Sequence, residues 1–325
     1  MRITFVRHAE SQANLEGKWQ GQSNSPLSKL GRTQARKAAL RLAKEHFDVV
    51  IASDLDRTME TARAFERPLE PDAAWREIDV GTWEGLTSYQ VSTRFVGESA
   101  ALAEGQQDVK VGGGESWNEL TERAVAAFDK LIARLGDKDH ALVVSHGGLL
   151  ATLVAELLGI RGVHPRPLGR LGNTAIVSVR IDGGHIEIER YNDAGHLAPA
   201  TPAVLERVDS GNTVVALLAR GDAETGTRFR TFHKDIRAVY GDSHVAHAKE
   251  RAPESLLETH GPGLCALEVE GDTFHGHAHR IACGALRGRA RLGLPRAGGY
   301  AHVAVSESRS SLVDYNLTGH LDGTT

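Results

Sequence analysis

The chain has 325 residues, of which 41% are hydrophobic and 25% charged, and its formal net charge is −4. This length predicts two domains or one large one, and the composition is that of a soluble globular protein with enough residues to bury a core. The charge excludes a generally basic chain made for nucleic acid, two cysteines exclude a disulfide scaffold or a four-thiolate zinc site, and no apolar run is long enough to span a membrane.

The first two hundred residues alternate strand and helix signals. Ile3 to Val6 is a short apolar run typical of a buried strand, and it turns polar at Arg7, too early for a secretory signal peptide, so we expect a cytoplasmic protein. Further strands are predicted over residues 49–52 and 141–144, a hairpin over 174–180 and 185–190, and helices over 31–47, 55–65, 117–135 and 149–158. This alternation indicates an α/β fold with helices on the faces of a sheet.

A change in composition near residue 200 predicts a domain boundary. Residues 197–202 read Leu-Ala-Pro-Ala-Thr-Pro, all four tryptophans precede them, and only two lysines follow. We therefore expect a catalytic domain over residues 1–200 and a second domain over residues 205–325.

Four polar segments of the first domain follow predicted strands or lie close to their ends. They are Arg7-His8-Ala9-Glu10 with the residues up to Leu27, Ser53 to Thr58, Arg76 to Gly85, and Ser145 to Gly148. Open α/β sheets bind their ligands beyond the carboxyl ends of the strands. Each segment alone would indicate only a turn, a loop or a helix start, but their order and spacing together favour a single site.

The residue types in these segments suit phosphoryl transfer. The planar guanidinium of arginine matches phosphate oxygens, and a neutral histidine can attack phosphorus to form a phosphohistidine. A carboxylic acid on the opposite side can protonate the departing oxygen and then activate water. Because such a reaction depends on positioning and charge neutralisation, well-placed arginines make a metal or other cofactor unnecessary.

In this order, the segments resemble those of the histidine phosphatase superfamily, also called the phosphoglycerate mutase-like family, over residues 2 to about 196. The resemblance implies a three-layer α/β/α sandwich around a mostly parallel sheet. It implies that His8 is the phosphorylated nucleophile and Glu77 the proton donor. The residues implied to hold the phosphoryl group are Arg7, Arg57 and His146. Those implied to line the phosphate or substrate pocket are Asn14, Gln20, Gly21 and Gly147.

The third segment favours a phosphatase over a mutase. Its sequence, Glu-Ile-x-x-Gly-x-Trp-Glu-Gly from Glu77 to Gly85, resembles the phosphatase branch, whereas the mutase branch typically has Glu-Arg-x-Tyr-Gly there. We therefore expect a metal-independent phosphomonoesterase that acts on a small phosphorylated metabolite, with no nucleic-acid or membrane partner. Two alternatives stay open, a phosphoglycerate mutase-type phosphotransfer and a protein that only binds a phosphorylated ligand.

The residues after 205 contain five faint echoes of the first domain. Residues 215–224 resemble 2–10, 242–252 resemble 52–62, 271–274 resemble 114–117, 291–293 resemble 134–136, and 302–308 resemble 141–147. These echoes predict a smaller, degenerate α/β copy of the first domain. The copy is expected to be inactive, because Gly221 or Asp222 would replace His8, His247 would replace Arg57 and Glu307 would replace His146. We expect either a monomer whose two domains pack as a pseudo-dimer or a homodimer.

One histidine-rich run raises the question of a metal. His275, His277 and His279 alternate along the chain, so an extended strand would place them on one face, where they could ligate zinc. The other interpretation is a histidine-rich helix start or loop in a chain that has 16 histidines. We favour the second interpretation and predict no metal site.

Overall fold

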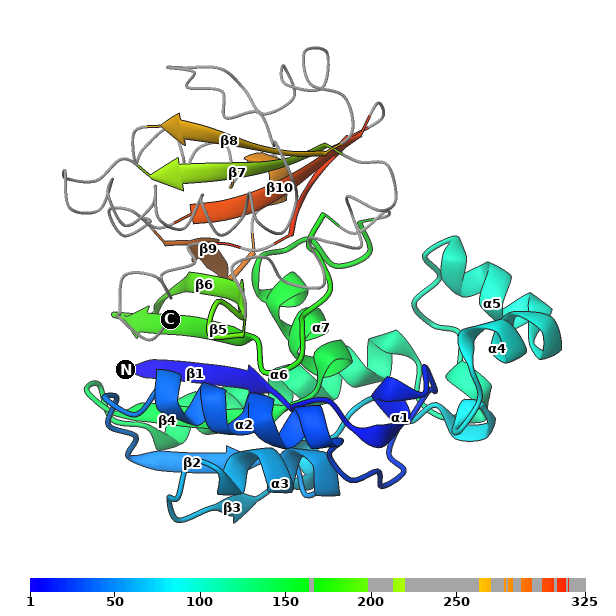
Figure 1. Ribbon diagram of the computed structural model, residues 1–325, viewed down its shortest axis with the longest axis horizontal. Coiled ribbons are helices and arrows are strands. Elements are labelled where there is room, and N and C mark those ends of the chain that lie inside the picture. The colour runs from blue at the N-terminus through cyan, green and yellow to red at the C-terminus, as the bar shows by residue number, and fades with distance from the viewer. Residues whose placement is uncertain are drawn as a thin grey trace.

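The computed structural model describes residues 1–163, 167–197, 213–219, 263–269, 278, 280–282, 288–293, 300–306, 309–313 and 315. Its main feature is a seven-stranded sheet in the order β3-β2-β4-β1-β5-β6-β9 (Figure 1). The strands are β1 (Arg2–Arg7), β2 (Val49–Ala52), β3 (Glu70–Pro71), β4 (His140–Ser145), β5 (Ile176–Asp182), β6 (His185–Asp193) and β9 (Ala290–Leu292). Of the six neighbouring pairs, four are parallel, and only β5 runs antiparallel to its neighbours β1 and β6. The predicted mostly parallel sheet is confirmed.

Helices pack on both faces of this sheet and make three layers (Figure 1). The helices α2 (Lys29–Arg41) and α3 (Asp56–Arg63) cover one face, and α6 (Trp117–Arg134) and α7 (Gly147–Leu157) cover the other. Side chains of β1 point alternately to the two faces, as strand geometry requires. Phe5 packs on Phe128 of α6, whereas Val6 belongs to a cluster with Ala62 of α3. The predicted α/β/α sandwich is confirmed for the first domain.

Three short helices lie outside the predicted elements. They are α1 (Gln12–Leu15), α4 (Ser88–Arg94) and α5 (Val96–Ala103), and the last two stand out at one side of the molecule (Figure 1). Helices α1 and α5 bury none of their residues, and α4 buries only Val91. Without a buried stripe, these segments carry no apolar periodicity that would reveal a helix.

The described part beyond residue 200 forms a second sheet and also extends the first. The second sheet has the order β11-β10-β7-β8, with β7 (Thr213–Ala219), β8 (Gly263–Val269), β10 (Tyr300–Ser306) and β11 (Arg309–Leu312). Strand β9 instead pairs with β6, so this part of the chain covers an edge that β6 would otherwise expose. Tyr315 strengthens the junction through backbone hydrogen bonds with Tyr191 in both directions.

These pairings bear on the predicted degenerate copy. The echoes align β7 with β1 and β10 with β4, yet β7 and β10 are antiparallel whereas β1 and β4 are parallel. They also align residues 291–293 with the end of α6, but Arg291 and Leu292 lie in a strand of the first sheet. The second copy stays an unconfirmed prediction, and both observations count against it. The remaining positions on which it depends, Gly221, Asp222, His247 and Glu307, lie outside the described residues.

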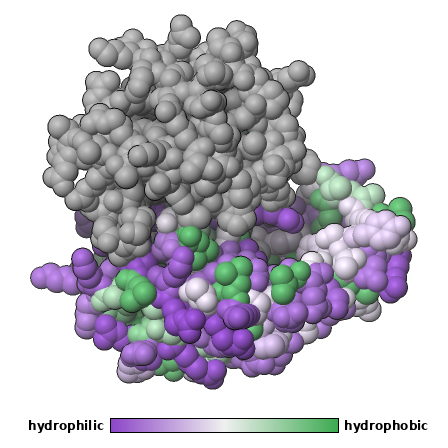
Figure 2. Space-filling model, viewed as in Figure 1, coloured by the Kyte–Doolittle hydropathy of each residue, from purple (hydrophilic) through white to green (hydrophobic). Residues whose placement is uncertain are grey.

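The described surface is mainly polar on the face shown in Figure 2, with single apolar side chains scattered over it. None of the helices in the described ranges is both long and apolar enough to cross a membrane. In the same ranges no group of three or more His, Cys, Asp or Glu side chains is placed to hold a metal ion. His275, His277 and His279 lie outside these ranges.

Candidate active site

The two candidate histidines meet where β1 and β4 end side by side. His8 directly follows β1 and His146 directly follows β4, and the amide of His8 donates to the carbonyl of Ser145 over 2.8 Å. The two imidazole rings lie edge to face with their centroids 5.2 Å apart. The parallel pairing of the strands thus brings together residues 138 positions apart in the sequence.

The imidazole of His8 is buried and held in one tautomer. Its Nδ1 lies 2.7 Å from the carbonyl oxygen of Ala9. Because a carbonyl only accepts hydrogen bonds, Nδ1 carries the hydrogen and Nε2 keeps its lone pair. Burial, and then the charges of Arg57 and Arg7, hold the pKa of His8 well below its ordinary value. The ring is therefore neutral at physiological pH, which is the form that can act as a nucleophile.

His146 is fully buried and has one nitrogen engaged. Its Nε2 lies 2.9 Å from the hydroxyl of Ser53, while Nδ1 has no partner among the described residues. When the Ser53 hydroxyl donates to Nε2, Nδ1 carries the hydrogen and can donate it to a bound oxygen. Burial and the charge of Arg57 lead the causes that hold the pKa of His146 far below its usual range.

Two guanidinium groups, that of Arg57 buried and that of Arg7 half-buried, supply positive charge beside these rings. Arg7, at the end of β1, donates to the carbonyl of Leu171 over 2.5 Å, and Arg57, in the first turn of α3, donates to the carbonyls of Gly21 and Ser23 over 2.8 and 2.9 Å. Burial lowers the pKa of each arginine to about 10, so both stay charged at neutral pH. The Nε of each has no partner in the described part of the chain, which leaves donors for an anion.

Glu77 lies at the amino terminus of α7. Its carboxylate accepts from the amides of Gly148 and Leu149 over 2.9 and 3.0 Å, and also from the amide of Ile78. The charge of Glu77 raises the pKa of both Arg7 and Arg57, against the effect of burial. The carboxylate itself contacts the turn that directly follows His146.

Glycines allow this close approach at the start of α7. A Cβ on Gly148 would lie 2.5 Å from Oε1 of Glu77, and one on Gly147 would lie 3.0 Å from Nε of Arg7.

The predicted pocket residues have structural contacts near His8. The side chain of Gln20 accepts from the hydroxyl of Ser11 over 2.7 Å. The side chain of Asn14 accepts from the amide of Ser11, the N-cap of α1, and from Asn173, whose amide also donates to the carbonyl of His8.

Gly21 holds Arg57 through its carbonyl and has a φ of 52°, in the left-handed region that favours glycine. A Cβ there would lie 2.7 Å from Oε1 of Glu84. Nothing in these contacts tests a substrate role for Asn14, Gln20 or Gly21.

Several residues that shape the site were not predicted. Besides Ser53, they include Glu84, whose Oε1 accepts from the amides of Gln22 and Ser23 and so fixes the loop that holds Arg57. Arg123 projects from α6, pairs with Glu115, and donates to the carbonyl of Glu77 over 3.1 Å. The signal that could have marked Arg123 is its place beside Ala124 and between Leu120 and Ala127, which are core positions of the helix.

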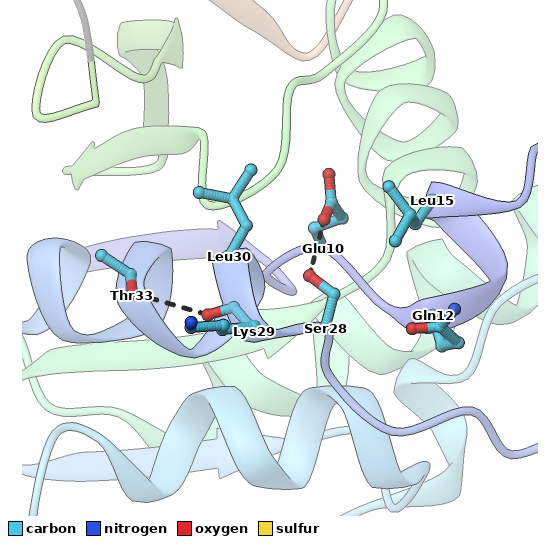
Figure 3. A pocket seen from close by; sticks show the side chains of 7 residues that line it. All are labelled: Glu10, Gln12, Leu15, Ser28, Lys29, Leu30 and Thr33. Atoms are coloured by element: carbon cyan, nitrogen blue, oxygen red, sulfur yellow. Dashed lines mark hydrogen bonds between the residues drawn. The ribbon is translucent and has the colours of Figure 1, made fainter.

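A hollow is lined by residues of α1, of the start of α2 and of the residues just before these helices (Figure 3). The side chains lining it are Glu10, Gln12, Leu15, Ser28, Lys29, Leu30 and Thr33. Glu10 accepts a hydrogen bond from Ser28 over 2.6 Å, so its carboxylate is engaged in fixing the start of α2. None of the nine predicted site residues lines this hollow, and we assign it no catalytic role.

Known proteins match the same part of the chain. The family model described as histidine phosphatase superfamily (branch 1) matches residues 3–194. A probable phosphoglycerate mutase GpmB of an Enterobacter species is 36% identical over 213 residues, which cover 62% of this chain and 97% of that protein. A glucosyl-3-phosphoglycerate phosphatase of Mycolicibacterium vanbaalenii is 33% identical and covers 56% of this chain and 87% of its own length. Among solved structures, a mutant phosphoserine phosphatase of Entamoeba histolytica in complex with phosphoserine superposes with a TM-score of 0.55 at 25% identity, covering 61% of this chain and 99% of that one.

Proposed function

The chain belongs to the histidine phosphatase superfamily, and we propose that it is a metal-independent phosphomonoesterase that hydrolyses a small phosphorylated metabolite through a phosphohistidine on His8. The observation that carries this proposal is the state of His8. Its ring is neutral, its Nδ1 is committed to the carbonyl of Ala9, and it lies beside two guanidinium groups. These features support a role for Nε2 of His8 as a nucleophile beside a cationic pocket for the phosphoryl oxygens.

The first half of the proposed reaction transfers the phosphoryl group to the protein. Nε2 of His8 attacks phosphorus as the bond from phosphorus to the ester oxygen breaks. The departing oxygen takes a proton from the carboxyl group of Glu77 and leaves as an alcohol. Arg7 and Arg57 neutralise the charge on the phosphoryl oxygens, and Nδ1–H of His146 donates to one of them.

The second half regenerates the enzyme. The carboxylate of Glu77 removes a proton from water, whose oxygen attacks phosphorus as the bond to Nε2 breaks. Inorganic phosphate leaves, and both His8 and Glu77 return to their starting protonation states. Every proton and electron pair in this scheme is held by groups present at the site, so no metal is invoked.

Mutase activity is the second candidate. The relative that is a probable phosphoglycerate mutase, at 36% identity, supports it. The segment from Glu77 to Gly85 and the two relatives that are phosphatases support hydrolysis instead. In a mutase, the phosphoryl group on His8 would return to another hydroxyl of the substrate rather than pass to water.

An assay with an aryl phosphate and a metal chelator tests the proposal. We expect the chain to release inorganic phosphate at an unchanged rate when chelator is present, and the His8→Ala variant to lose activity by several orders of magnitude. Isomerisation of 3-phosphoglycerate that outpaces its hydrolysis would favour the mutase. Near-normal turnover by His8→Ala, or loss of turnover with chelator, would overturn the proposal.

A further inference from the structure

The loop between α7 and β5 is fixed against the catalytic end of β1. The carbonyl of Leu171 accepts from Arg7 over 2.5 Å, and the side-chain amide of Asn173 donates to the carbonyl of His8 over 3.1 Å. The amide of Thr174 donates to the carbonyl of Arg7 over 3.0 Å. The residues of this loop therefore border the phosphoryl pocket.

Strand β6 anchors the same loop from behind. The side chain of Asn192 accepts from the amide of Gly172 over 2.7 Å and donates to the carbonyl of Arg170 over 3.0 Å. The hydroxyl of Tyr191 donates to the carbonyl of Gly169 over 2.6 Å. Hydrogen bonds from β6 thus fix the backbone at Arg170 and before and after it. The side chain of Arg170 therefore starts from a defined position at the rim of the site.

Arg170 itself is exposed and has no ion-pair partner among the described residues. Two further arginines near the site are paired, Arg76 with Asp54 and Arg123 with Glu115. Burial lowers the pKa of Arg7, the charge of Glu77 opposes that effect, and the charge of Arg170 lowers the pKa of Arg7 further. The positive charges of Arg7 and Arg170 repel each other in the free protein. An anion bound between or beside them offsets this repulsion.

We propose that Arg170 is a specificity-determining residue that binds a second anionic group of the substrate, a carboxylate or a second phosphate. In the proposed reaction, Arg7 and Arg57 already neutralise the charge of the transferred phosphoryl group. A third cation at the rim is therefore available for another anionic group of the substrate. An exposed guanidinium can bind a carboxylate or phosphate through two parallel hydrogen bonds. This inference rests on the proposed function, since it assigns a substrate class to the same site.

Binding to the His8→Ala protein tests the inference without turnover. Two matched pairs of ligands differ by one anionic group: 3-phosphoglycerate against glycerol 3-phosphate, and fructose 1,6-bisphosphate against fructose 6-phosphate. In at least one pair we expect the ligand with the additional anion to bind more tightly, by about tenfold, as for one charge-assisted hydrogen bond. The pair that responds shows whether the group is a carboxylate or a phosphate.

Variants at Arg170 give the decisive comparison. Arg170→Ala, made in the same background, should remove the preference within that pair and leave the affinity for the ligand with one anionic group within about twofold, while Arg170→Lys should retain part of the preference. Arg67→Ala is the matched control, because Arg67 is another exposed arginine without an ion-pair partner in the described chain. Arg67 precedes β3, the edge strand at the other end of the strand order from β6 and β9. Equal losses for both members of each pair in Arg170→Ala, or no preference before the substitution, would overturn the inference. Failure of the unaltered protein to hydrolyse an aryl phosphate would instead overturn the proposed function.

Discussion

At the scale of single residues, the proposed reaction divides the chemistry between His8 as the nucleophile and Glu77 as the proton carrier. A hydrogen bond to the carbonyl of Ala9 fixes the tautomer of His8, and burial with the charges of Arg57 and Arg7 lowers its pKa. Glu77 is held by residues far away in the sequence. An amide at the start of α7 donates to its carboxylate, and Arg123 donates to its carbonyl. The two roles respond differently to the leaving group, and that difference can be measured.

Glu77→Gln should slow esters with poor leaving groups much more than activated aryl esters in the phosphoryl-transfer step. Only an alkyl ester needs a proton on its departing oxygen, and general acid catalysis is typically worth about a hundredfold or more. Single-turnover rates of phosphoenzyme formation with an alkyl phosphate and an aryl phosphate measure the effect. Arg57→Ala is the comparison, since Arg57 would contact oxygens common to both substrates and should slow both alike. Equal losses for the two esters in Glu77→Gln would remove Glu77 from the acid role.

The motif residues could be predicted from the sequence, but several of their partners could not. His8, Arg57 and His146 each follow a short apolar strand or open a helix, and their order along the chain is informative. Ser53 and Glu84, by contrast, act through hydrogen bonds to groups far away in the sequence. Such bonds leave no periodic pattern, so only the folded chain reveals them.

At the scale of elements, the amino terminus of α7 organises the site. Gly147 and Gly148 open the helix directly after His146, and the absence of side chains lets Arg7 and Glu77 approach the backbone. The sequence predicted this helix from 149, where its leucines begin, because glycine pairs ordinarily indicate a turn. The helix in fact starts at Gly147. The amides of Gly148 and Leu149, in its first turn, donate to the carboxylate of Glu77.

Gly148→Ala should therefore impair catalysis without unfolding the protein. The new Cβ would meet the end of a flexible side chain, at 2.5 Å from Oε1 of Glu77, so the carboxylate should shift rather than the helix. We expect a loss with the same dependence on the leaving group as in Glu77→Gln, by roughly tenfold or more for an alkyl phosphate. Steady-state kinetics and a thermal melt measure activity and folding separately.

Gly97→Ala is the matched control for this prediction. Gly97 is likewise the second residue of its helix, α5, and a Cβ there has no neighbour within 4 Å. This variant should keep full activity and gain a few tenths of a kcal/mol in stability, since alanine favours a helix over glycine by up to about 1 kcal/mol. Unchanged activity in Gly148→Ala would show that the carboxylate does not need its place at the start of α7.

At the scale of the whole molecule, the first sheet continues beyond the predicted boundary near residue 200. Strand β9 pairs with β6, and the side chain of Asn192 donates to the carbonyl of Val313 over 3.0 Å. The boundary was predicted from composition alone, and composition does not record which strand covers an open sheet edge. An echo of three residues, such as Arg-Leu-Gly at 291–293, recurs by chance, and this one matched the end of a helix although its first two residues lie in a strand.

Buried neutral histidines predict that the protein loses stability in acid. Burial lowers the pKa of both His140 and His196 from 6.5 to about 4. Between these values the unfolded chain binds protons that the folded chain does not, so the free energy of unfolding falls as the pH drops from 6.5 toward 4. One such histidine contributes a slope of up to about 1.4 kcal/mol per pH unit.

Urea unfolding across this pH range measures the loss. His196→Gln should show a shallower decrease than the unaltered chain, because it removes one group that is forced to stay neutral in the fold. His46→Gln is the control, since the side chain of His46 is 81% exposed, and it should follow the unaltered chain. A slope unchanged by His196→Gln would contradict the assignment of acid sensitivity to this buried ring.

Trapping the phosphorylated protein tests the central claim most directly. The chain is mixed with an aryl phosphate and quenched in alkali within the first turnovers, and the modified residue is located by tandem mass spectrometry. The account predicts a phosphoryl group on His8, at a higher level in Glu77→Gln, where water is activated slowly, and none in His8→Ala. Hydrolysis that proceeds with no phosphoryl group on His8, or a phosphoryl group trapped on another residue at the catalytic rate, would contradict it.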